Sequence, residues 1–197
     1  MAGLSDSAAR AVLDRVAPAF GALSVQAIDN VQTVCRGETR YGRAWASSPS
    51  PCDSGWDSYN WGAVKVKASA TKDANGNWGC APTGFPCFDE DKVTPHCFRQ
   101  YANDDEGAAG VFRVLMGMKH VSAFLLAGGG TPAEMAHVMR LDGYYTAPEK
   151  DYTALLTRMR NEMLPAMGRK AGVSVAAMVT GGLSLLGIGL AGWRFSR

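Results

Sequence analysis

The sequence predicts an α+β fold in which a mainly helical body carries a small β-hairpin lobe. Apolar residues recur at helical spacing on both sides of a short central segment, where they change to the alternation typical of a strand. Hydrophobic residues make up 47% and charged residues 19% of the 197 positions, so we expect one domain with a buried core. A long uncharged segment near the C-terminus adds a predicted transmembrane helix.

Two helices are expected first, over residues 5–18 and about 24–39. Ser5 or Asp6 is the predicted N-cap of the first, and Pro18 and Gly21 interrupt the pattern before the second. Turn-forming residues then indicate a loop over 47–58. Spacing places the following residues on the inward faces of the two helices: Ala9, Val12, Leu13, Val16, Ala27, Val31, Val34 and Cys35.

The β lobe is predicted from the segment 61–70, where Val64, Val66 and Ala68 alternate with polar residues. The turn 73–77 contains Asn-Gly, which tolerates the positive φ of a tight hairpin, and Trp78 begins the return strand. Residues 80–97 are expected to form an irregular insert, and 98–101 a short closing strand.

Three more helices follow in the predicted body. The first runs from Asp104 or Asp105 to Leu126 and is stopped by the glycines at 128–130. Residues 131–134 form a capping box with proline at the first helical position, so the second helix begins there and ends at Gly143. The third covers about 148–163, with these residues facing inward: Tyr152, Leu155, Leu156 and Met159.

Composition argues against several classes of function. The net charge is only +2, from 20 basic and 18 acidic residues, so we expect no nucleic-acid partner. The spacing C-x6-C-x8-H-C at 80–97 lacks the paired knuckles of structural zinc sites, so no metal and no cofactor are predicted. Disulfides within this insert, or one between Cys35 and Cys52, are expected if the domain meets an oxidising space.

The segment 171–193 contains no charged residue and would span roughly 35 Å as a helix, enough for a hydrocarbon core of about 30 Å. Arg169 and Lys170 precede it and Arg194 and Arg197 follow it, so two basic residues on each side leave its orientation open. We therefore expect a domain at 1–165 and a membrane anchor at 166–197. The alternative is a buried, glycine-rich terminal helix. As a membrane span, the segment 171–193 also has small residues that would allow self-association.

Glu38 is the most informative charged residue of the predicted body. It ends a largely apolar helix at the junction with the β lobe, and a partly desolvated glutamate in such a cleft has the raised pKa of a general acid. The alternative interpretation is a surface ion pair with Arg36 or Arg40, which flank it.

Four short motifs, in order, resemble the glucosaminidase family of lysozyme-like peptidoglycan hydrolases, which includes flagellar and phage muralytic enzymes. Residues 38–42 (ETRYG) are similar to its E-[ST]-x-[WY]-G stretch, and 59–64 (YNWGAV) to its N-N-x-[FW]-G strand entry. Residues 98–101 (FRQY) resemble its F-R-x-Y step into a helix. Residues 143–148 (GYYTAP), followed by Tyr152, resemble its G-Y-[AY]-T-x-P-x-Y motif. Two features depart from the pattern: the strand entry is shifted by one residue, and Ala147 replaces an acidic residue. The cysteine-containing insert has no counterpart.

The resemblance implies a lysozyme-like fold, Glu38 as the catalytic acid and Tyr144 as its partner. A second catalytic group is not fixed by the sequence. Asp57 is our candidate, with Asp53 and Asp73 as alternatives, and the family also includes lytic transglycosylases with one essential carboxylate. Expected substrate contacts are Tyr41, Asn60, Trp61 and Tyr145.

The expected function is cleavage of the glycan strands of bacterial peptidoglycan by a membrane-anchored glycosidase, encoded by a phage and used in wall penetration or lysis. Its expected location is a virion membrane or the host envelope. The alternative from another class is a non-catalytic lysozyme-like module for glycan binding or assembly. The sequence leaves open which glycosidic bond is cut, and whether water or a substrate hydroxyl attacks.

Overall fold

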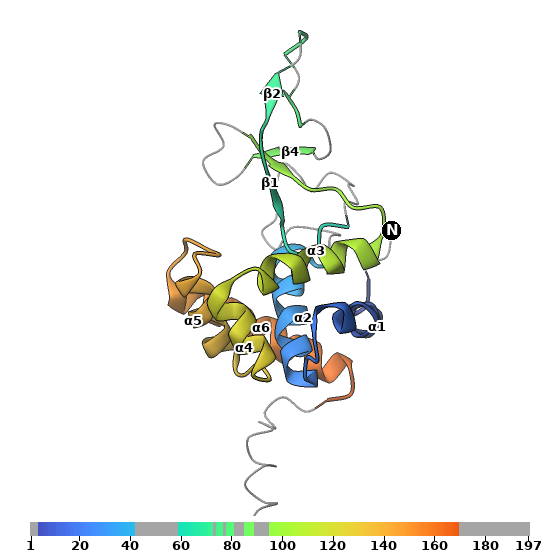
Figure 1. The fold of residues 1–197 in the computed structure, drawn as a ribbon, viewed down its shortest axis with the longest axis vertical. Coiled ribbons are helices and arrows are strands. Elements are labelled where there is room, and N and C mark those ends of the chain that lie inside the picture. The colour runs from blue at the N-terminus through green and yellow to red at the C-terminus, as the bar shows by residue number, and fades with distance from the viewer. Residues whose placement is uncertain are drawn as a thin grey trace, which may run out of the picture.

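The computed structural model describes residues 4–41, 59–72, 74–76, 78–80, 85–88 and 95–169. Their helices form a body from which the strands project at one end (Figure 1). The helices are α1 Asp6–Val16, the 3-10 turn η1 Ala17–Phe20, α2 Val25–Thr39, α3 Asp104–Met116, α4 Lys119–Leu126, α5 Pro132–Leu141 and α6 Glu149–Ala166. The strands are β1 Lys65–Ser69, β2 Thr71–Lys72, β3 Trp78–Gly79, β4 Phe85–Phe88 and β5 Pro95–Phe98. The prediction of a mainly helical body with a few strands beside it is confirmed.

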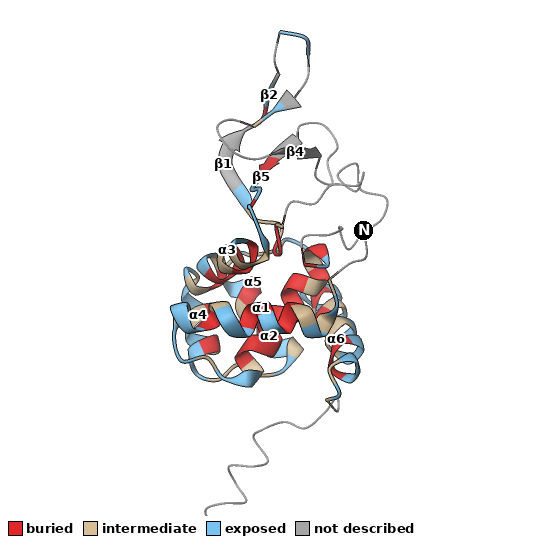
Figure 2. Cartoon of the chain, turned by 90° about the vertical axis from the view of Figure 1, so that its right-hand side faces the viewer, coloured by how far each residue is buried: buried red, intermediate tan, exposed pale blue. Residues whose placement is uncertain are grey.

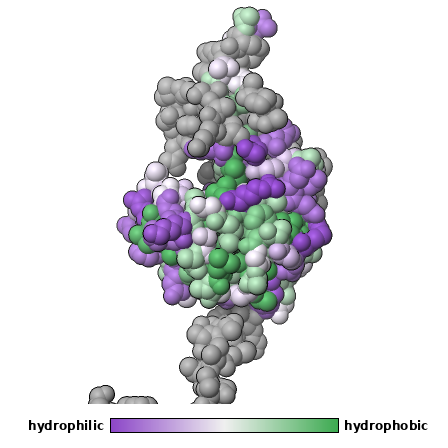
Figure 3. Space-filling view, viewed as in Figure 1, coloured by the Kyte–Doolittle hydropathy of each residue, from purple (hydrophilic) through white to green (hydrophobic). Residues whose placement is uncertain are grey.

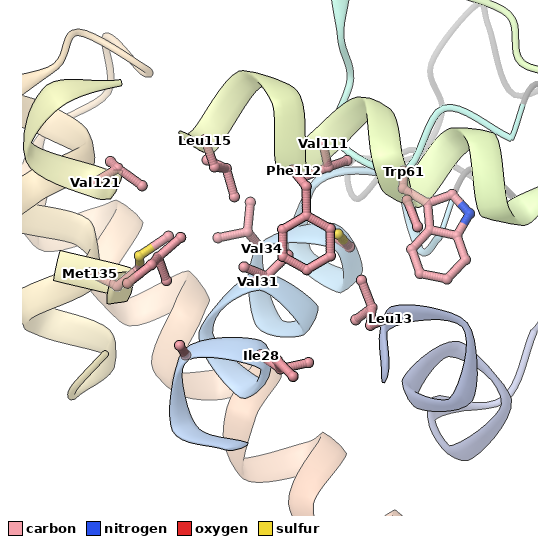
Figure 4. Packing of buried hydrophobic residues seen from close by; sticks show 14 of the residues in the cluster. Leu13, Ile28, Val31, Val34, Trp61, Val111, Phe112, Leu115, Val121 and Met135 are labelled. Carbon is pink, nitrogen blue, oxygen red and sulfur yellow. The ribbon is translucent and has the colours of Figure 1, made fainter. Parts of the chain in front are cut away.

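Helix α2 forms the centre of the body. Its predicted inward residues Ala27, Val31, Val34 and Cys35 are all fully buried. Figure 4 shows Val31 and Val34 among side chains from the surrounding helices, including Phe112 of α3. Burial of this kind contributes about 1.5–3 kcal/mol for each large apolar side chain, so packing around α2 stabilises the body.

Side-chain caps fix where several helices begin. Ser5 and Ser24 accept hydrogen bonds from the backbone amides of Ala8 and Ala27, as expected for N-caps. Thr131 forms the predicted capping box with Glu134. These signals are local, because each cap lies within three residues of its partner.

The predicted helix over 104–126 is wrong in one respect: it is two helices, α3 and α4, which meet at an angle of 107°. Gly117 ends α3, and the carboxylate of Asp142 accepts hydrogen bonds from the amides of His120 and Val121, which begin α4. Asn103, rather than Asp104 or Asp105, is the N-cap of α3. A distant carboxylate thus allows a new helix to start where the local pattern shows no break.

The β lobe contains more strand than the sequence predicts. The hairpin of β2 and β3 around Asn75-Gly76 agrees with the prediction, with Thr71 opposite Gly79. The insert, however, supplies β4 and β5, which join β1 in an antiparallel sheet of order β1-β5-β4. The closing strand ends at Phe98 instead of continuing to residue 101. Cys80 and Cys97 form a disulfide across this insert, while Cys35 is free, so the alternative Cys35–Cys52 pairing is wrong.

Within the helical body, the buried residues lie where the helices pack on one another and the exposed residues lie on the outer faces (Figure 2). Within the described residues no single helix is long and apolar enough to cross a membrane, although α1–η1 with α2, and α3 with α4, pass that test as bent pairs. The predicted span 171–193 lies outside the described residues. Helix α6 continues past the expected domain boundary at 165, and Arg169 still contacts Asp29 of α2 at 2.7 Å.

Candidate active site

A cleft of about 390 Å³ lies where the helical body meets the β lobe. This volume is within the range of small-ligand sites. Its walls come from the turn before β1, the end of β5, the α3–α4 junction and the turn after α5. The lining residues are Glu38, Gly62, Ala63, Val64, Lys65, Phe98, Val114, Met118, Gly143 and Tyr144. Four segments that are distant from Glu38 along the chain therefore line the same cleft as Glu38.

Glu38 lies in the last turn of α2 and is half-buried in this cleft. Burial raises the pKa of its carboxyl group, while a hydrogen bond from the Tyr152 hydroxyl to Oε1, at 2.6 Å, acts in the opposite direction. The net direction is upward, which favours a protonated carboxyl group at higher pH than an exposed glutamate allows. Such a group can donate a proton to a bound substrate.

The alternative of a surface ion pair between Glu38 and Arg36 does not describe this arrangement. Arg36 instead contacts Asp6 at 3.0 Å and Glu162 at 2.6 Å. With that cation directed elsewhere, burial is the main influence on the pKa of Glu38.

Tyr152 of α6, rather than the expected Tyr144, donates the hydrogen bond to Glu38. Its ring stacks on Tyr145, with centroids 3.9 Å apart and planes 15° from parallel, and the Tyr145 hydroxyl donates to the carbonyl of Ala136. Tyr152 is therefore held from two sides. The sequence placed it on the inward face of the last helix, and its position in the 143–152 motif was the signal for a closer role.

Tyr144 does line the cleft, and its hydroxyl donates to the carbonyl oxygen of Gly62 at 3.2 Å. Burial and the nearby charge of Glu38 raise its pKa well above the ordinary value, so the phenol stays protonated. Tyr144 thus joins the turn after α5 to the turn before β1. The expected pairing of Tyr144 with Glu38 is replaced by this link between the walls.

Three expected substrate contacts are buried and already engaged. Trp61 is fully buried under α3 and donates through Nε1 to Asp104, as its orientation in Figure 4 illustrates. Asn60 is 2% exposed and donates to the carbonyls of Val64 and Arg99. Their side chains hold the turn before β1 in place, and neither is among the described residues that line the cleft.

Tyr41 behaves in the same way. It is 2% exposed, donates to Asp6 Oδ1 at 2.6 Å and packs its ring against Trp61. Tyr145 is partly buried in the stack described above, so it supports the site through Tyr152. Asp57, together with Asp53 and Asp73, lies outside the described residues. A second catalytic carboxylate therefore stays unassigned.

Backbone strain is concentrated around Glu38. Among the described residues, positive φ angles outside glycine occur at Arg40, Tyr41, Tyr59 and Ala63. Arg40 and Tyr41 directly follow the end of α2. Tyr59 and Ala63 flank the residues 60–62. Non-glycine residues in this region cost of order 1–3 kcal/mol each, and such strain gathers at functional sites. It is consistent with a turn shaped for this cleft.

The described residues also place a buried thiol close to Glu38. Cys35, one turn before Glu38, is fully buried, and burial raises its pKa far above that of a reactive thiol. No group of three or more histidine, cysteine, aspartate or glutamate side chains suited to a metal ion occurs among these residues.

No family model, curated protein or solved structure matches this chain.

Proposed function

We propose that this protein is a membrane-anchored glycosidase that cleaves the glycan strands of bacterial peptidoglycan. The observation that carries the proposal is the half-buried Glu38, hydrogen-bonded by Tyr152, in a cleft between the helical body and the β lobe. The order of the four motifs supports it. One residue from each of the other three motifs lines the cleft beside Glu38: Gly62, Phe98 and Tyr144.

The chemistry of glycosidic cleavage fits a protonated Glu38. The leaving oxygen needs a proton, and the oxocarbenium-like transition state needs negative charge or a nucleophile. Glu38 supplies the proton, and Tyr152 holds its carboxyl group in one orientation. The attacking group is either a water activated by a second carboxylate or a hydroxyl of the substrate itself.

Mass spectrometry of fragments from purified peptidoglycan tests this function directly. We expect new ends on the glycan strands. Reducing N-acetylglucosamine, reducing N-acetylmuramic acid and anhydro-muramic acid ends distinguish the two hydrolytic cleavages from transglycosylation. Fragments cut only in the stem peptides, or intact strands after prolonged incubation, would contradict the proposal.

Tyr152→Phe tests how the acid is held. The change keeps the ring stacked on Tyr145 and removes the hydroxyl that stabilises the Glu38 carboxylate. Because that hydrogen bond lowers the pKa of Glu38, its loss should raise the pKa further and move the alkaline limb of the pH–rate profile to higher pH. Tyr145→Phe, which loses a hydrogen bond to a backbone carbonyl, is the control and should leave that limb in place.

Removal of residues 171–197 tests the anchor. All residues that line the cleft precede this segment, and the shortened chain keeps the contact between Arg169 and Asp29. We expect it to stay in the supernatant after ultracentrifugation, to melt cooperatively and to cut peptidoglycan. A truncated chain without a cooperative melt would show that the segment is part of the core.

A further inference from the structure

Two uncharged stretches of sequence meet at the end of the helical body that lies away from the β lobe. One is 16–28, which covers η1 and the start of α2, and the other is 121–133, which covers most of α4 and the start of α5. We call the surface formed by these two stretches the uncharged end.

Specific contacts hold the two stretches together. The Ser24 hydroxyl donates to the carbonyl of Gly128 at 2.7 Å, and the Gln26 side chain donates to the carbonyl of Gly130. Gly129 has a φ of +72° and lies so close to Ala27 that a Cβ there would contact its backbone. The glycines at 128–130 thus do more than stop α4, because they let the turn lie against the start of α2.

The uncharged end exposes large apolar side chains. Val25 is 57% and Leu126 55% exposed, and they are two of the three large exposed hydrophobic residues in the described part of the chain. The third is Leu141, at the end of α5. Apolar surface gathers over the lower half of the body in Figure 3, with hydrophilic residues beside it. A single exposed leucine is ordinary, but a gathered patch indicates a partner.

The chain beyond α6 indicates which partner covers this patch. Arg169 contacts Asp29, which is one helical turn from Val25, and Arg160 donates to the carbonyl of Gly130 at 2.9 Å. The last described residue is therefore fixed beside the uncharged end. The 23 uncharged residues of 171–193 begin two positions later. A segment of this length and composition partitions into a bilayer, so a lipid surface adjoins the patch.

We propose that the uncharged end docks on the lipid surface that residues 171–193 enter, which directs the cleft away from the membrane. This inference rests on the membrane anchor in the proposed function. Val25 and Glu38 lie near opposite ends of α2, about 20 Å apart along the helix axis at 1.5 Å per residue. Docking at the first end therefore presents Glu38 toward material outside the bilayer.

The test uses the full chain in vesicles of phosphatidylethanolamine and phosphatidylglycerol that contain nitroxide-labelled lipids. Leu126→Cys and Leu141→Cys form a matched pair, because both leucines are 55% exposed and only Leu126 belongs to the uncharged end. Each variant carries a bimane label, and the parent chain taken through the same labelling gives the background from its own cysteines. We expect lipid quenching several-fold stronger at position 126 than at position 141.

Equal quenching at the two positions, or none at position 126, would overturn the proposal. A label at position 126 whose emission is shielded from water without lipid quenching would identify a second copy of the chain as the occupant, which also overturns it. Glu38→Gln in the same vesicles separates this inference from the enzymatic one. The variant should keep the quenching pattern of position 126 whether or not the parent cuts peptidoglycan.

Discussion

Replacement of Glu38 by glutamine should lower the rate of peptidoglycan cleavage by about 10²–10⁴, the usual contribution of general acid catalysis. Glutamine keeps the shape and polarity of the side chain and can still accept a hydrogen bond from Tyr152, but it has no proton to donate. The measurement is the release of soluble fragments from purified peptidoglycan under initial-rate conditions.

The pH dependence follows from the same carboxyl group. Glu38 acts in its protonated form, and burial raises its pKa, so activity should fall as the pH rises through that raised value. The alkaline limb should be absent from any residual activity of Glu38→Gln. A variant that clears peptidoglycan at the parent rate would show that Glu38 is not the acid. If it loses no affinity for glycan strands and the parent shows no cleavage, the chain is a glycan-binding module.

Stability should move in the opposite direction from activity. A carboxyl group whose pKa is raised in the folded state contributes stability at low pH and loses that contribution as the pH rises through the folded pKa. Glutamine carries no such cost at neutral pH, so the melting temperature of Glu38→Gln should equal or exceed that of the parent.

Tyr144→Phe should reduce the rate less than Glu38→Gln does, because it removes only the hydroxyl that contacts Gly62.

The sequence predicts the helical body well because most of its signals are local. The serine caps at positions 5 and 24, the capping box at 131–134 and the apolar spacing of α2 all act within one or two turns. The break between α3 and α4 could not be predicted in this way. It depends on Asp142, which follows α5 more than twenty residues further along the chain and accepts hydrogen bonds from the first amides of α4.

In the candidate site, too, features with a local signal were predicted, and features that depend on distant neighbours were not. The motif around Glu38 indicated a carboxyl group that lines the cleft. Its role as the catalytic acid stays a prediction. The motif aromatics were predicted to touch substrate, whereas Trp61 and Tyr41 are buried against each other and hold the junction. Residue type alone does not tell a sugar-stacking ring from a packed one. That difference depends on which neighbours cover the ring.

Glycines in α3 let this junction form, and Gly107→Ala should disrupt it. A Cβ at position 107 would overlap the carbonyl oxygen of Tyr59 and lie 2.9 Å from the indole of Trp61. Alanine would otherwise favour a helix over glycine by about 1 kcal/mol, so any loss of stability must come from this overlap. Because the first obstacle is backbone, which a side-chain rotation cannot relieve, we expect a loss of about 3 kcal/mol or more.

Thermal and denaturant unfolding measure this effect, and Gly79→Ala is the matched control. Among the residues that the structure describes, the nearest atom to a Cβ at position 79 is the Thr71 carbonyl oxygen, 4.0 Å away, so the same substitution meets no overlap with them. We expect the control to melt within a few degrees of the parent and to retain activity. Gly107→Ala should lose activity together with stability, because a displaced turn at 59–62 moves Gly62 and the cleft wall away from Glu38. A Gly107→Ala variant as stable and active as the control would mean that the turn before β1 does not rest on α3 as described.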